Sequence, residues 1–131
     1  LKIDGRNNLY SLGILCLHRK DYPIAKQFFI DYYNASREFE EHRSTCELVI
    51  SLAAVAGGMN EPERATTLSG AAQGIFEVIE YGIPPIDQAE FDRHIQIARQ
   101  QLGETRFQEL QAVGRAMTIE QAVAYALENQ E

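Results

Sequence analysis

The sequence contains no tryptophan, only two cysteines, and no apolar run that approaches the ~20 residues needed to cross a bilayer. Its first residues, LKIDGRNN, lack the apolar core of a signal peptide. Cys16 and Cys46 each lie in an apolar helical pattern, where a free thiol packs as a small hydrophobe. These absences predict a protein of the reducing cytoplasm, with neither a membrane-spanning segment nor a disulfide framework.

Basic residues are also scarce, since 12 Lys and Arg stand against 19 Asp and Glu, for a net charge of −7 at pH 7. No window gathers the basic residues into a stripe, and neutralised phosphates supply most of the affinity of proteins for nucleic acids. Direct binding of DNA or RNA is therefore disfavoured. A helix-turn-helix near the C-terminus is disfavoured too, because Arg106 and Arg115 stand there among glutamates.

The chain is rich in helical periodicity instead. Apolar residues recur at three- and four-residue steps in seven segments, which predicts an all-α fold of about seven helices. Capping residues mark the expected helix starts, and glycines and prolines mark the ends. The predicted caps are Asp21, Asn60 with Glu63, Asp87 with Glu90, and Thr118 with Gln121.

The chain also repeats itself at a shift of 40 residues. The matched positions are Leu9, Leu12, Gly13, Cys16, Ala25, Phe29 and Tyr32, which fall on Val49, Leu52, Ala53, Ala56, Ala65, Ser69 and Ala72. The L-G pair and the A-x3-F spacing in the first unit resemble the tetratricopeptide repeat. We therefore predict one domain, residues 1–131, built as a right-handed stack of antiparallel helix hairpins. Its units are expected at about 5–40, 44–82 and 87–116, with a capping helix at 118–129.

A second resemblance covers roughly residues 48 to 128. The motifs that carry it are Pro62-Glu63-Arg64-Ala65, Gly70-Ala71-Ala72, Pro84-Pro85, Leu102-Gly103, Phe107, Gly114 and Ala122 to Leu127. Their order is similar to the C-terminal tetratricopeptide-like region of bacterial signal-transduction ATPases, namely LuxR-type and MalT-like transcriptional regulators and related cyclase-linked proteins. This chain departs from the family pattern at Ser69, where the family usually has Leu, and at Gln111, where it often has an aromatic residue.

The resemblance implies a fragment of a multidomain regulator. ATP would be bound by an upstream module, and this segment would bind no cofactor. We expect a non-catalytic interaction or sensor module whose concave face binds a protein or peptide partner or a small inducer, and so shifts the ATPase between two states. The repeat register places these residues on that face: Asn7, Tyr10, Ser11, Ile14, Glu47, Ile50, Ser51 and Ala54. The competing hypothesis is a structural spacer or dimerisation scaffold without a ligand, and a homodimer is compatible with either.

Two constellations of chemically active side chains have structural explanations. Cys16, His18, His42 and Cys46 are the types that bind zinc, but residues two apart point to opposite sides of a helix, so no metal site is expected. Glu90 and His94 lie one helical turn apart, with Asp87 and Asp92 nearby, as in a carboxylate–imidazole pair. Asp87 and Glu90 are explained as a helix cap. A small helical enzyme using Glu90 and His94 is the third, least favoured hypothesis.

Overall fold

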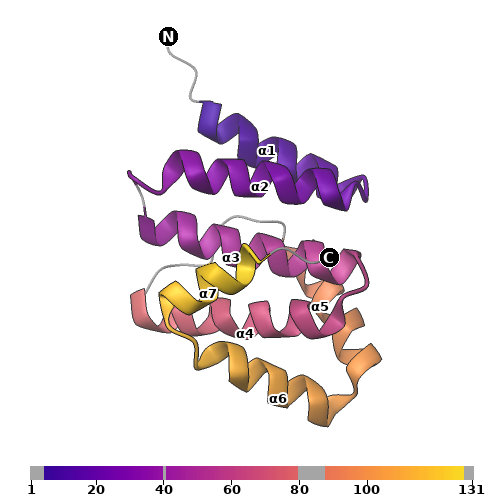
Figure 1. The fold of residues 1–131 in the computed structure, drawn as a ribbon. Coiled ribbons are helices and arrows are strands. Elements are labelled where there is room, and N and C mark those ends of the chain that lie inside the picture. Colours follow the sequence, from indigo (N-terminus) through magenta and orange to yellow (C-terminus); the bar gives the residue numbers. More distant parts are fainter. Residues whose placement is uncertain (1–4, 40, 80–87, 129–131) are drawn as a thin grey trace.

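The computed structural model describes residues 5–39, 41–79 and 88–128, and within these ranges it is all-α, with seven helices and no strand (Figure 1). The predicted all-α class with about seven helices is confirmed. The helices are α1 (Gly5–His18), α2 (Tyr22–Ser36), α3 (Glu41–Gly58), α4 (Pro62–Ile79), α5 (Gln88–Leu102), α6 (Glu104–Arg115) and α7 (Ile119–Ala126). None of the described helices is long and apolar enough to cross a membrane.

The 40-residue repeat is present in the backbone. Helices α1 and α3 end in the same turn, in which Lys20 and Asn60 adopt left-handed φ angles of 65° and 63°. The next amide donates to a carbonyl oxygen five positions earlier, at 2.9 Å in both turns: Asp21 to Cys16 and Glu61 to Ala56. This pattern is the Schellman motif, which satisfies the last carbonyl groups of a helix. The first two units therefore share the geometry of the turn between their helices.

The predicted helix caps have different outcomes. Thr118 and Gln121 form the expected capping box, with backbone-to-side-chain distances of 3.1 and 2.9 Å. Asp21 precedes α2, but its side chain makes no capping hydrogen bond. Asn60 belongs to the turn, and its carboxamide oxygen accepts a hydrogen bond from Gln101 Nε2 at 2.7 Å. Asp87 lies outside the described residues.

Helix α3 forms the centre of the core. It contacts α2, α4, α5 and α7, and every residue from Ser44 to Ala56 is buried. A helix with neighbours on all sides needs small or apolar residues around its whole circumference. Ala53, like Ala25 on α2 and Ala65 on α4, is fully buried. Phe29 fills the α1–α2 hairpin so closely that a Cβ on Gly13 would come within 2.6 Å of its ring.

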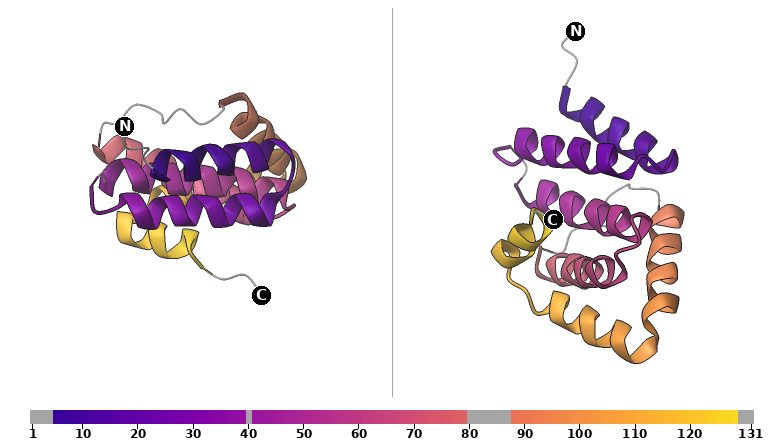
Figure 2. Two further views of the ribbon diagram at one scale, coloured as in Figure 1. Left: turned by 90° about the horizontal axis from the view of Figure 1, so that it is seen from above. Right: turned by 45° about the vertical axis from the view of Figure 1, so that its right-hand side comes forward.

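The second half of the chain packs differently from the first two hairpins. Helix α5 crosses the ends of α3 and α4, and α6 then lies along α4 (Figure 2). The expected third hairpin over 87–116 is therefore splayed open. Helix α6 can lie close to α4 because Gly70, Gly74 and Gly114 remove side chains from the crossing. Helix α7, which lies within the capping helix expected at 118–129, packs across α3 and α4.

Candidate functional site

The structure separates the eight residues that were expected to line a concave face. On α1, Ser11 is exposed, Tyr10 and Ile14 are half-buried, and the side chain of Asn7 lies outside the described part of the chain. The α3 residues Glu47, Ile50, Ser51 and Ala54 are all 3% exposed or less. The expectation of an open surface is therefore wrong for these four, because α2, α4, α5 and α7 pack around α3.

Two of the expected residues, Tyr10 and Glu47, form a buried polar joint with Tyr32 of α2. The Tyr32 hydroxyl donates a hydrogen bond to Glu47 Oε1 at 2.8 Å, and the rings of Tyr10 and Tyr32 are 5.0 Å apart. Burial, followed by the hydrogen bond to Glu47 and its charge, raises the pKa of Tyr32 to about 12. Burial likewise raises the pKa of Tyr10 well above its ordinary range. Both phenols stay protonated at neutral pH, so the joint ties α1, α2 and α3 together without offering a reactive oxygen.

A solvent-open cavity of about 210 Å³ lies where α3, α4, α5 and α6 meet. It is lined by Ile50, Ser69, Ala72, Gln73, Phe76, Phe91 and Gln111, and we call it the Gln73–Gln111 pocket. No charged side chain is among these lining residues. Two phenylalanines provide apolar walls, and the two glutamine amides can each donate and accept hydrogen bonds.

Only Ile50 in this pocket was among the expected site residues. Two other lining residues, Ser69 and Gln111, are the positions at which the sequence differs from the regulator-like pattern that it was expected to resemble. A serine in place of leucine removes volume, and a glutamine in place of an aromatic residue adds an amide. Sequence alone did not reveal that the two positions face one cavity, because they lie on different helices, α4 and α6.

Glu90 and His94 do meet, as their one-turn spacing allows. His94 Nε2 lies 3.0 Å from Glu90 Oε1, while the imidazole packs edge-on against Tyr22 with ring centroids 5.9 Å apart. The His94 side chain is 3% exposed, and burial lowers its pKa below the ordinary value. The hydrogen bond from Arg93 is the main cause that lowers the pKa of Glu90. The imidazole is thus a neutral group enclosed between α5, α2 and α3.

The two cysteines and two histidines that were considered as zinc ligands lie in three different environments. Cys46 is fully buried, Cys16 is half-buried, and His18 and His42 are exposed. Burial raises the pKa of the Cys46 thiol to about 12, so it is not a reactive thiolate. Within the part of the chain that the structure describes, no three His, Cys, Asp or Glu side chains gather as metal ligands would.

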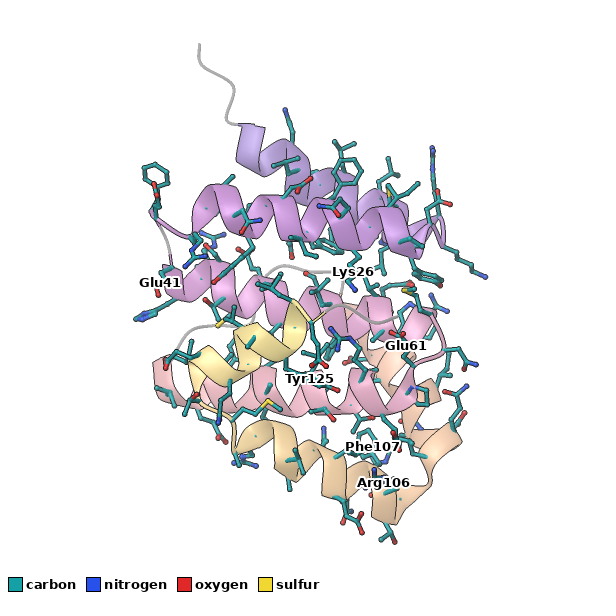
Figure 3. All side chains as sticks on the ribbon, viewed as in Figure 1. Lys26, Glu41, Glu61, Arg106, Phe107 and Tyr125 are labelled. Atoms are coloured by element: carbon teal, nitrogen blue, oxygen red, sulfur yellow. The ribbon has the colours of Figure 1, made fainter. Side chains whose placement is uncertain are left out.

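Arg64 has a role that the sequence analysis missed. Its Nη2 donates to the carbonyl oxygens of Tyr125 and Ala126, both at 2.9 Å, and its guanidinium lies 4.9 Å from the centre of the Tyr125 ring. A cation at the C-terminus of a helix satisfies carbonyl groups that the helix leaves unpaired. Arg64 therefore holds α7 against α4. Figure 3 shows Tyr125 on this side of the molecule, together with Glu61 and Lys26.

A second open cavity, of about 320 Å³, lies beside this clamp and is lined by Glu61, Pro62, Glu63, Arg64 and Tyr125. Glu63 forms an exposed ion pair with Arg106, and Arg64 Nη2 binds α7, whereas Arg64 Nη1 is buried and has no hydrogen-bond partner among the described residues. In comparisons with protein-family models, curated proteins and solved structures, no significant match to this chain was found.

Proposed function

We propose that this chain is a non-catalytic interaction module that binds an apolar side chain of a partner protein in the Gln73–Gln111 pocket. The observation that carries the proposal is the neutral, aromatic lining of an open cavity on an otherwise acidic protein. Apolar anchors that enter preformed pockets supply much of the energy of protein recognition. The two amides at the pocket are suited to pair with the peptide groups that flank such an anchor.

The volume of the pocket distinguishes a partner residue from a free inducer. Sites for drug-sized ligands usually enclose about 300–1,000 Å³. The pocket of about 210 Å³ falls below that range and matches one large side chain, such as Phe, Leu or Met. Among the described residues that line it, none is a cation that would pair with a carboxylate or phosphate, and none is an acid that would pair with an amine. An uncharged anchor residue is therefore the favoured occupant.

The resemblance to the LuxR-type and MalT-like regulators supports a place for this module in a cytoplasmic signalling protein. In that setting, a partner with different affinities for two states of the full protein would shift the equilibrium of an upstream ATPase. Ser69 and Gln111, the two departures from the family pattern, both line the pocket. They support a specificity particular to this chain. ATP binding would belong to the upstream module and not to this segment.

Blocked amino acids can test the pocket before any partner is known. We expect N-acetyl-phenylalaninamide and N-acetyl-leucinamide to shift backbone NMR signals around Gln73 and Gln111, with a Kd of about 1–10 mM, as suits a single anchor. The α-amide of N-acetyl-aspartate, whose side-chain carboxylate is charged at neutral pH, is expected to cause no shift there. Saturable shifts at another surface, or equal shifts from the aspartate probe, would contradict the proposal.

Two tryptophan variants on α4 provide a matched pair. Gln73→Trp places a bulky ring at the exposed mouth of the pocket and is expected to weaken binding of the phenylalanine probe at least tenfold. Val78→Trp adds the same ring at a residue that is 72% exposed and outside the pocket lining, and it should bind like the parent chain. If no probe binds at all, the spacer hypothesis is the better explanation of the chain.

A further inference from the structure

Helix α5 attaches to the rest of the molecule through few buried side chains. Among its described residues, only His94 and Ala98 are buried, at 2% and 1% exposed, whereas Phe91 and Ile95 are half-buried. An alanine methyl group contributes little to this attachment, because the hydrophobic free energy grows with the apolar area removed from water. The larger of the two buried side chains is thus an imidazole, a group that can gain a charge near neutral pH.

Three elements meet at His94. The Tyr22 ring of α2 packs edge-on against the imidazole, and a Cβ on Gly57 of α3 would come within 2.8 Å of the His94 Cβ. Lys20, in the turn between α1 and α2, is near enough for its charge to act on the imidazole. Helix α5 crosses the ends of α3 and α4 (Figure 2). His94 therefore lies in the contact that attaches α5 to the first two hairpins.

The contacts of His94 determine which ring nitrogen carries the proton at neutral pH. Glu90 is ionised there, because the hydrogen bond from Arg93 is the main cause that lowers the pKa of its carboxyl. A carboxylate only accepts hydrogen bonds, so His94 Nε2, 3.0 Å away, carries the proton and Nδ1 has the lone pair. Nδ1 is buried and has no hydrogen-bond partner among the described residues. A second proton would therefore enter at Nδ1, where no acceptor meets the new N–H group.

The charge of a protonated His94 is poorly balanced. Burial is the largest effect and lowers the pKa of the imidazole. Glu90 acts in the opposite direction, but the cations Arg93 and Lys20 add to the effect of burial, so the pKa stays below its ordinary value of 6.5. From α2 the imidazole meets the Tyr22 ring, and from α3 a glycine, so neither contact supplies a second carboxylate. Protonation is thus easier once α5 has moved and the imidazole reaches water.

From this arrangement we propose that α5 is an acid-sensitive latch, in which protonation of His94 shifts the helix from its place against α3 and α4 toward an open state. Acid favours the open state because that state binds the extra proton more tightly. Phe91, which precedes His94 by three residues, lines the Gln73–Gln111 pocket, so opening also removes a wall of that pocket. This last step rests on the proposed function, whereas the latch itself does not.

The corner between α5 and α6 allows α5 to move alone. Gly103 forms this corner with a φ of 85°, and beyond its chain neighbours no atom lies within 4 Å of a Cβ built there. The Arg99–Glu104 ion pair that spans the corner is exposed, and exposed pairs hold weakly. Helix α6 remains on α4 through the close packing at Gly70 and Gly114. Opening is therefore expected at α5, with α6 left in place.

Imidazole NMR of the parent chain tests the premise without any substitution. We expect the nitrogen chemical shifts of His94 to report a proton on Nε2 and none on Nδ1 at pH 7.5. The titration midpoint of the ring should lie below 6.5. A ring protonated on Nδ1 at pH 7.5, or a midpoint at or above the ordinary value, would overturn the proposal.

Hydrogen exchange, corrected for the intrinsic pH dependence of amide exchange, measures the latch. Amides of residues 92–102 should open at least tenfold more often than those of residues 44–56 in α3, because α5 opens without unfolding the core. From pH 7.5 to 5.5 the opening equilibrium of α5 should rise about three- to tenfold, the range that proton linkage to one histidine allows. His94→Gln should abolish this rise, and His18→Gln, at an exposed position, should keep it.

Three results separate the latch from its alternatives. Amides of α5 that open only as often as those of α3 would assign the pH effect to global unfolding and overturn the proposal, as would an undiminished rise in His94→Gln. N-acetyl-phenylalaninamide at twice its Kd should slow α5 opening about threefold, because it binds the closed form; a probe that binds without this effect would overturn the link to the pocket. A chain that binds no probe but keeps the pH-dependent opening would contradict the proposed function and support the latch.

Discussion

Gly114→Ala tests the close packing of α6 on α4. A Cβ at Gly114 would collide with the Thr67 carbonyl oxygen and come within 2.8 Å of the Ala71 amide nitrogen. Both atoms belong to the α4 backbone and cannot rotate away. Overpacking costs about 1–3 kcal/mol, and the upper end applies to backbone contacts of this kind. Since alanine improves helix propensity by about 1 kcal/mol over glycine, we expect a net loss of about 2 kcal/mol.

Urea unfolding measures this loss directly. With a slope of about 2 kcal/mol per M, the midpoint of Gly114→Ala should fall by about 1 M. Ala112→Gly, at an exposed position of the same helix, is the matched control, and it should lose about 1 kcal/mol from helix propensity alone. The reasoning is refuted if Gly114→Ala raises the midpoint. The gain in helix propensity would then exceed the free-energy cost of the collision with the α4 backbone.

Three further outcomes are expected. Arg64→Met keeps an apolar stem but removes the donors to α7, so amide exchange over residues 119–128 should accelerate at least tenfold, with a loss of about 2 kcal/mol in unfolding free energy. Tyr32→Phe deletes the hydrogen bond to Glu47 and should cost about 1–2 kcal/mol in the same urea assay. Acidification from pH 7.5 to 5 should lower the unfolding free energy, because burial holds the pKa of His94 below its ordinary value of about 6.5, so the folded state binds fewer protons than the unfolded chain. That loss begins as the pH falls past the ordinary value and is complete below the folded pKa; a pH profile unchanged by His94→Gln would contradict this assignment.

Most of the helices and turns could be predicted because their signals are local. The box at Thr118 and Gln121 needs residues only three positions apart, and the helix stop at Gly103 rests on its left-handed φ of 85°. The 40-residue repeat could be recognised in the sequence because the residues that form each hairpin lie close to one another along the chain. Glu90 and His94 meet for the same reason, since they share one face of one helix.

The candidate site could not be predicted in this way. Glu47 and Ser51 were expected on an open surface, but both are buried, and Tyr32 of α2 donates a hydrogen bond to Glu47. The packing of the first hairpin on α3 therefore covers residues that a single two-helix unit would expose. The Gln73–Gln111 pocket draws its walls from four helices, so no single periodic pattern contains it. Arg64 similarly meets its partners on α7 about 60 residues away.

The sequence by itself determined the helical class, the equivalence of the first two hairpins and the turns that end them. These features depend on backbone preferences and side chains within a few residues of one another. Only the tertiary structure decided which faces are covered, where α5, α6 and α7 lie, and where a cavity remains. The physical reason is that burial depends on the packing of helices from distant parts of the chain, and the side chains of one helix do not encode which neighbour will reach it.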